Sequence, residues 1–305
     1  MMDAVKTTAP IKRHKKLSAF DIVNLILLSL LCLTFLYPFY NILVYAFNDG
    51  QDAMKGVLYL WPRKITLDNF KVALAQDGLL NAVKISVLRT VIGTFFTVIG
   101  CSSLGYAMSK RQLPGYKAFM IFFFITFIFN GGMIPYFLTV KELGLYNTFW
   151  IYVIPGAYGY WNMILFRSFF DSIPHSIEES AKIDGASYLY VFFKLIIPLS
   201  KPVFATIVLF TAVGHWNDWF AGTFYVKDQD LIPLQTLLQN LMTEANMLTK
   251  VMEMGGSANI LSQTSITPYS IRLAIVVITV VPIIMVYPFL QKYIVKGMMV
   301  GAVKG

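Results

Sequence analysis

Long apolar runs separated by short polar stretches dominate the hydrophobic pattern of this chain. A transmembrane helix needs about 20 predominantly apolar residues, because each residue adds about 1.5 Å to the helix. Six runs reach or approach that length: residues 22–48, 86–109, 118–140, 145–168, 202–226 and 271–291. The pattern predicts an all-α integral membrane protein with six transmembrane helices, whose transmembrane domain 22–291 lies between the tails 1–21 and 292–305.

The composition agrees with this class of protein. Hydrophobic residues make up 57% of the 305 residues and charged residues only 13%, whereas soluble domains carry about 25% charged residues. So few charges cannot cover the surface of a soluble chain of this size. The net charge of +9 does not indicate nucleic-acid binding, because no basic patch interleaved with stacking aromatics lies outside the apolar runs.

The distribution of Lys and Arg predicts the orientation of the chain. If the N-terminus is cytoplasmic, the inside segments contain 15 of the 25 basic residues, and the somewhat longer outside segments contain the rest. Cytoplasmic loops carry an excess of Lys and Arg. We therefore expect a multi-pass protein of the cell (plasma) membrane with both termini in the cytoplasm. The first apolar run is too long for a signal peptide, and no cleavage site follows it.

This orientation places two long segments outside, residues 49–89 and 227–272. The second contains Gly255-Gly256-Ser257 and several polar residues, so part of it is predicted to be mobile. Cys32 and Cys101 both lie in apolar runs and predict no disulfide. The three histidines are far apart in sequence, so no metal site is expected.

Backbone-breaking residues interrupt several of the runs. Two interpretations are open: these residues permit kinks and close helix packing, or they shape a kinked bundle around a substrate path. The residues concerned are Pro38, Gly93, Gly100, Pro135, Pro155-Gly156, Pro282 and Pro288.

The segment 172–198, between the fourth and fifth runs, carries most of the information. Ser176 and Glu179 have the spacing of a capping box, which predicts the start of a helix at Ser176. Gly185 lies where a left-handed residue would end that same helix. A second, apolar helix then runs to Pro198. The physics predicts two short helices joined at a glycine, either as a docking element for a soluble partner or as an ordinary interfacial loop.

The same segment resembles the EAA loop of ABC importer permeases. That loop reads E-A-A, three residues, G, nine residues and I-x-L-P; here Glu179-Ser180-Ala181, Gly185 and Leu195-x-Ile197-Pro198 keep the spacing and depart at three positions. The string Glu179 to Ala186 is similar to the carbohydrate-uptake, maltose-permease-like branch. Phe129 to Pro135 and the terminal Tyr293 to Gly305 resemble a Gram-positive subgroup that imports complex oligosaccharides.

The resemblance implies a transmembrane permease subunit of an ATP-driven importer for a sugar or oligosaccharide. It implies a second homologous permease subunit, two ATPase subunits, and an extracellular lipid-anchored or periplasmic sugar-binding protein as partners. ATP and Mg would belong to the ATPase subunits, with no cofactor, catalytic residue or metal on this chain, which lacks a G-x-x-x-x-G-K-[ST] phosphate loop. The expected ATPase-coupling residues are Glu178, Glu179, Ala181, Asp184, Gly185 and Ala186.

Polar and aromatic side chains in two runs are candidates for a sugar path. Sugars are held by hydrogen bonds to hydroxyls and by aromatic faces, and Trp216-Asn217-Asp218 resembles an element of sugar permeases. Aromatic residues at helical spacing are also common as packing residues, so both interpretations stay open. The candidates are Trp216, Asn217, His215, Asp218, Trp161 and Asn162.

Two other functions compete with the permease. A secondary transporter or channel for a polar solute usually places ionisable groups at the bilayer midplane, and here the apolar runs are nearly free of charge. A membrane enzyme would need convergent acid, base or nucleophile residues. His215 and Asp218, three apart on one helix, form a candidate dyad, with a vestibule or a helix neighbour as the simpler explanation.

Overall fold

The computed structural model describes residues 18–75, 78–253 and 267–302. Within these ranges the chain is helical, apart from loops and one isolated β-bridge between Asn48 and Ile65. The helices, in which η3 is a π-helix and the other η elements are 3₁₀ turns, are α1 Ala19–Ala46, α2 Gly50–Met54, α3 Asp68–Leu74, α4 Leu79–Ser109, α5 Tyr116–Ile128, α6 Met133–Glu142, η1 Phe149–Tyr152, η2 Pro155–Ala157, α7 Tyr160–Phe170, α8 His175–Ile183, α9 Tyr188–Val191, η3 Phe192–Ile196, α10 Ile197–Leu199, α11 Lys201–Asn217, α12 Phe220–Tyr225, η4 Gln229–Leu231, α13 Leu234–Glu253 and α14 Pro268–Ala302.

Only some of the predicted apolar runs form unbroken helices. In the described part of the chain, α1 and α4 are each long and apolar enough to cross a membrane, and two bent helix pairs add up to two more candidates. The helix α14 extends beyond the predicted boundary at 291. Six membrane spans therefore remain a prediction, whereas the helical, membrane-type fold class is established.

Three of the predicted spans are interrupted. Residues 118–140 divide into α5 and α6, which bend by 117° at Asn130-Gly131-Gly132, where Gly132 has a φ of +85°. Residues 145–168 form two 3₁₀ turns before α7, because Pro155 starts η2 and prevents one continuous helix. Residues 202–226 divide into α11 and α12 at Asp218. The breaks near Pro135 and at Pro155-Gly156 agree with backbone breakers in the sequence, whereas the break at Asp218 was not anticipated.

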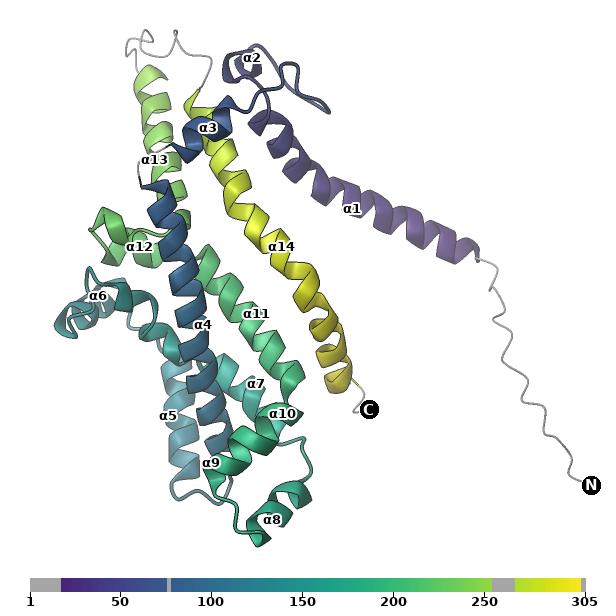
Figure 1. The fold of residues 1–305 in the computed structure, drawn as a ribbon, viewed down its shortest axis with the longest axis vertical. Coiled ribbons are helices and arrows are strands. Elements are labelled where there is room, and N and C mark those ends of the chain that lie inside the picture. The colour runs from purple at the N-terminus through teal and green to yellow at the C-terminus, as the bar shows by residue number, and fades with distance from the viewer. Residues whose placement is uncertain (1–17, 76–77, 254–266, 303–305) are drawn as a thin grey trace, which may run out of the picture.

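The helix α4 is the central element of the fold. It runs the length of the bundle, from the end near α3 and α13 to the end near α8 and α9 (Figure 1). It contributes to all three buried clusters, through Leu79 and Ala82 in one, Cys101 and Tyr106 in another, and Ile85 in the third. Helices from every other part of the bundle therefore pack on α4.

Glycines allow this close packing. A Cβ at Gly100 would lie 2.3 Å from the carbonyl oxygen of Ala157 in η2, and one at Gly93 would lie 2.5 Å from the ring of His215. Small residues let helix backbones approach in membrane proteins. These contacts support the close-packing interpretation at Gly93 and Gly100.

The helix α1 diverges from the bundle (Figure 1), and residues 19–40 are exposed, whereas Val44 and Ala46 in its last turn are buried. Its C-terminal end is attached to the following loop, because Tyr40 donates a hydrogen bond to the carbonyl oxygen of Leu60 (2.5 Å) and Asn41 donates one to that of Leu58 (2.8 Å). The segment Gly255-Gly256-Ser257, for which mobility was predicted, lies outside the described residues.

Candidate functional site

A cavity of about 440 Å³ lies where the interrupted helices converge. We call it the central cavity. It is bounded by α4, by the two 3₁₀ turns with the start of α7, by α6, and by the junction of α11 with α12. Its lining residues are Arg89, Thr97, Tyr136, Ile151, Tyr152, Pro155, Gly156, Asn162, Phe210, Thr211, Gly214, His215, Asp218 and Ala221.

A buried ion pair forms one wall of the central cavity. Arg89 of α4 is 2% exposed, and its Nη2 lies 2.5 Å from Oδ2 of Asp218. Its Nη1 donates a hydrogen bond to the backbone carbonyl oxygen of Asp218 (2.7 Å), and its guanidinium lies over the ring of Tyr152. The Oδ1 atom of Asp218 accepts a hydrogen bond from the backbone N–H of Phe220 (2.9 Å). Asp218 therefore fastens the α11–α12 junction to α4 and also caps α12.

The structure brings together half of the predicted sugar-path residues. His215, Asp218 and Asn162 all line the central cavity. Both carboxylate oxygens of Asp218 are already engaged by Arg89 and the cap, which disfavours the proposed catalytic dyad. The described residues contain no group of His, Cys, Asp and Glu that could hold a metal ion.

The other three predicted path residues lie elsewhere. Trp216 is buried against α14, where its indole N–H donates to the carbonyl oxygen of Thr279 (3.1 Å). The side-chain oxygen of Asn217 accepts a hydrogen bond from Gln235 of α13 (3.1 Å). Trp161 is 61% exposed and does not line the cavity. On a helix, adjacent residues point about 100° apart, so one sequence element cannot present all its side chains to one cavity.

Sequence reasoning missed Arg89, because it was assigned to an external segment at the edge of an apolar run. The claim that the runs are nearly free of charge was therefore too strong. A signal was present: Asp218 is the one acid within the predicted runs, and a buried acid requires a basic partner. The candidates for that partner within the runs were Arg89, Arg167 and Arg272, and the fold selects Arg89.

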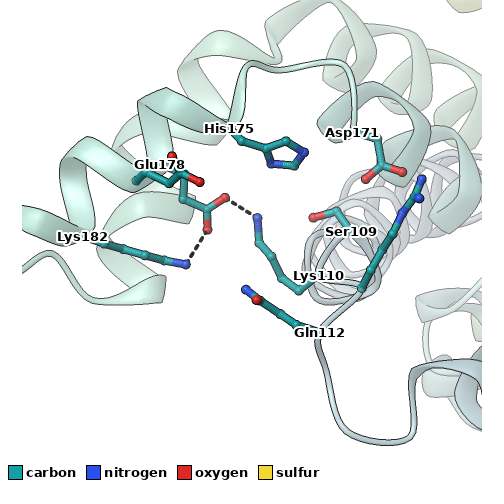
Figure 2. Close-up of a pocket in the computed structure, with 9 residues that line it drawn as sticks. Ser109, Lys110, Gln112, Asp171, His175, Glu178 and Lys182 are labelled. Carbon is teal, nitrogen blue, oxygen red and sulfur yellow. Dashed lines mark hydrogen bonds and ion pairs between the residues drawn. The ribbon is translucent and has the colours of Figure 1, made fainter.

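A second candidate site lies at the opposite end of α4. There a cleft of about 540 Å³ separates the end of α4 from α8 (Figure 2). Its lining residues are Ser109, Lys110, Arg111, Gln112, Asp171, His175, Glu178, Glu179 and Lys182.

Glu178 is the central charged group of this cleft. It is 8% exposed, and its carboxylate accepts hydrogen bonds from the hydroxyl of Tyr106 (2.8 Å) and from Lys110, while Lys182 lies 3.5 Å away. Figure 2 shows both lysines directed at the carboxylate. Burial by itself raises the pKa of Glu178, but the hydrogen bonds from Lys110 and Tyr106 and the lysine charges outweigh it, so the pKa lies below its ordinary value. Glu178 is therefore ionised at neutral pH.

The predicted coupling residues divide between two faces of α8 and the turn after it. Ala181 and Ala186 pack against a buried cluster of the same chain. Glu178 also faces the same chain, because it contacts Tyr106 of α4. Glu179, Asp184 and Gly185 are exposed. Next to them, Ile183 is 86% exposed. Only this second group is available to a partner.

The turn after α8 follows the predicted geometry, but the start of α8 does not. Gly185 has a φ of +83°, its N–H donates to the carbonyl oxygen of Lys182 (3.0 Å), and the N–H of Ala186 donates to that of Ala181 (2.9 Å). These bonds form a Schellman motif. The capping box was wrong: α8 starts at His175 after Pro174, so Ser176 lies inside the helix and does not cap it. The proline ends the preceding turn and fixes the start of the helix.

Comparison with known proteins identifies the fold. A model of the binding-protein-dependent transport system inner membrane component family matches residues 18–300. The chain belongs to this family. This permease is 36% identical to Protein LplC of Bacillus subtilis over 94% of the chain and 95% of LplC. It is also 36% identical to the polygalacturonan/rhamnogalacturonan transport system permease protein YtcP of the same organism, over 92% of the chain and 96% of YtcP.

A solved structure has the same fold. One chain of a bacterial ABC transporter involved in the import of the acidic polysaccharide alginate matches the permease with a TM-score of 0.79 and 31% identity, over 90% of the permease and 96% of that chain. The resemblance to ABC importer permeases of sugars is therefore confirmed.

The Arg89–Asp218 pair gives an asymmetric prediction for stability. Asp218→Ala leaves a buried guanidinium unpaired and should lower the free energy of unfolding by about 3–5 kcal/mol. Arg89→Met leaves a carboxylate that is 34% exposed and can be hydrated, so the loss should be about 1–3 kcal/mol. The free energy of unfolding, measured by denaturant titration in detergent, checks both values.

The double variant is the control for this prediction. Its loss should be smaller than the sum of the single losses by about 0.5–3 kcal/mol, because the two side chains contact each other. Additive losses, or a larger loss for Arg89→Met than for Asp218→Ala, would contradict the ion pair as described.

Proposed function

We propose that this permease conducts an oligosaccharide through the central cavity, as one of two homologous permease subunits of an ATP-driven ABC importer. The observation that carries the proposal is the position of the cavity. Interrupted helices around a polar cavity are typical of membrane transport sites, because irregular backbone is tolerated only where it is buried in protein or lines a cavity. Membership of the transport family supports it independently.

The chemistry of the cavity suits a sugar. Asn162, Tyr136 and Thr211 offer amide and hydroxyl groups, and the hydroxyl of Thr211 is buried without a hydrogen-bond partner. The charges of Arg89 and Asp218 neutralise each other. Hydrogen-bonding groups without net charge suit sugar hydroxyls.

The similar proteins indicate which sugars should be tried first. One relative is named as a permease for polygalacturonan and rhamnogalacturonan, and the solved structure belongs to an importer of the acidic polysaccharide alginate. From these proteins, and not from the charge of the cavity, we infer an oligosaccharide that contains uronic acids. Oligogalacturonides are the first probes for uptake.

The remaining partners follow from the same proposal. The end of the permease that carries α8 faces the cytoplasm, both termini lie there, and each of two ATPase subunits contacts an EAA-type loop. The exposed Glu179, Ile183, Asp184 and Gly185 form the contact surface on this chain. A sugar-binding protein delivers the substrate at the opposite end, and this permease itself hydrolyses no ATP.

A secondary transporter is the alternative with a specific observation in its favour. Buried ionisable groups near the middle of a membrane helix bundle often bind coupling ions, and Arg89 with Asp218 is such a pair. Family membership favours the ATP-driven importer. Copurification of the permease tests the two functions. ATPase subunits that copurify with it and hydrolyse ATP during uptake would favour the ATP-driven importer over the secondary transporter.

Replacement of Asn162 tests the cavity. Asn162→Ala removes a hydrogen-bonding group from the cavity wall, so the apparent KM for oligogalacturonide uptake by the whole importer should rise about 5–30-fold, equivalent to about 1–2 kcal/mol. Trp161→Ala is the matched control, since the neighbouring side chain is exposed and outside the cavity. Equal uptake by the two variants would contradict a sugar path through this cavity.

Replacement of Gly185 tests the contact with the ATPase subunits. A Cβ at this position would meet no atom of the permease within 4 Å, so Gly185→Val acts only through its left-handed backbone, at about 1–2 kcal/mol, or through the partner. We expect normal insertion into the membrane and a sharp fall in ATPase copurification.

Gly185→Asn is the control for backbone strain, because asparagine tolerates the left-handed conformation. If strain alone matters, Asn restores copurification; if a side chain collides with the ATPase, both variants lose it. Wild-type copurification in both would contradict docking at this turn.

A further inference from the structure

The two adjacent glutamates of α8 have different surroundings. Glu179 is exposed, whereas Glu178 is buried. The Glu178 carboxylate accepts hydrogen bonds from the hydroxyl of Tyr106 in α4 and from Lys110, which follows α4 (Figure 2). Lys110 is itself largely buried, and its ammonium group lies 4.4 Å from the centroid of the Tyr106 ring. We call this set of contacts the α4–α8 brace.

The α4–α8 brace attaches α8 to the helix that forms the central cavity. The helix α4 is unbroken over 31 residues, about 47 Å at 1.5 Å per residue. In its first half it carries Arg89 of the ion pair, and Thr97 near its middle also lines the cavity. At the other end it carries Tyr106 and is followed by Lys110. A displacement of α8 that moves Lys110 therefore moves the cavity wall as well.

The covalent route from α8 to the cavity is less direct. It passes through the turn at Gly185, the π-helical segment η3, and an 83° bend between the helix ending at Leu199 and α11. Turns, π-helical segments and bends are the places where helices deform. These interruptions make the covalent route more deformable than the continuous α4, and the remaining link between α8 and α11 is the packing of Ala181 on the cluster that contains Ile207.

We propose that Glu178 is a positioning residue that transmits the movement of the docked ATPase subunits from α8 to α4, and thereby to the central cavity. The inference rests on the proposed function. It assigns different tasks to the two glutamates: Glu179 belongs to the contact surface, and Glu178 connects that surface to the rest of the permease. Because Glu178 is paired within its own chain, it does not contact the ATPase.

The experiment follows the cavity directly and needs no sugar. A Thr211→Cys reporter in a Cys32→Ala background places a thiol in the cavity wall, while Cys101 is fully buried. The assembled importer is reconstituted into liposomes, and the reporter is labelled with an impermeant maleimide from the side of the α13 end, with and without ATP and vanadate. ATPase copurification is measured on the same preparations.

In the reporter protein with an intact brace, trapping with ATP and vanadate should change the labelling rate of the reporter thiol by at least about fivefold, which is the lower end of the range for coupling between distant sites. Glu178→Gln and Lys110→Met should keep ATPase copurification and lose this response. Lys110→Arg should retain it, because it keeps the charge and the donors. The double variant Glu178→Gln, Lys110→Met should respond like either single variant, since both disrupt one connection.

The matched control is Glu179→Gln, on the neighbouring exposed position. It should reduce ATPase copurification, which Glu178→Gln should not. A normal labelling response in Glu178→Gln or Lys110→Met would overturn the inference, as would loss of copurification in Glu178→Gln. Loss of the response in Lys110→Arg would also overturn it. If the reporter protein with an intact brace binds no ATPase, the proposed function fails instead.

Discussion

A buried arginine in a helix bundle has to be paired, and the structure of this permease around its cavity depends on that requirement. An isolated charge in a low-dielectric interior costs far more free energy than a small domain can supply. Arg89 is paired by Asp218 across two helices. The same carboxylate caps α12, so one residue neutralises the arginine, ends α11 and starts the next helix. The cavity opens beside this junction.

The helix α4 carries Arg89 of this pair and runs along the molecule from the cavity to the α8 end. Three buried clusters contain its residues, and glycines on it allow η2 and α11 to approach closely. The elements that share the cavity wall with α4 belong to interrupted runs, while α4 is continuous. A continuous helix between two sites is a physical basis for coupling that does not depend on a chain of weak contacts. The α4–α8 brace attaches α8 to that helix.

Much of the fold could be predicted from the sequence, because hydrophobic run length is a strong signal in membrane proteins. The family and the turn at Gly185 followed from the spacing of a short motif. Backbone breakers indicated interruptions near Pro135 and at Pro155-Gly156, but nothing indicated the one at Asp218. A hydropathy pattern cannot distinguish a straight span from one that bends at Asn130-Gly131-Gly132, since α5 and α6 together are apolar enough to form one span.

The candidate site was predicted only in part for a related reason. His215, Asp218 and Asn162 line the cavity. Trp216 and Asn217 instead form hydrogen bonds with residues of α14 and α13. Membership of one motif says nothing about which side of a helix each residue occupies, particularly where the helix ends. Arg89 was missed because its partner is 129 residues away in sequence, and the pairing is visible only once the fold is known.

In the proposed function, a sugar occupies the cavity beside the Arg89–Asp218 pair during transport. An electron cryo-microscopy structure of the complete importer, trapped with ATP and vanadate in the presence of its binding protein and an oligogalacturonide, tests this most directly. We predict sugar density in the cavity lined by Asn162, Thr211 and His215. Sugar density confined to the partner permease, with this cavity closed by its own side chains, would contradict the account.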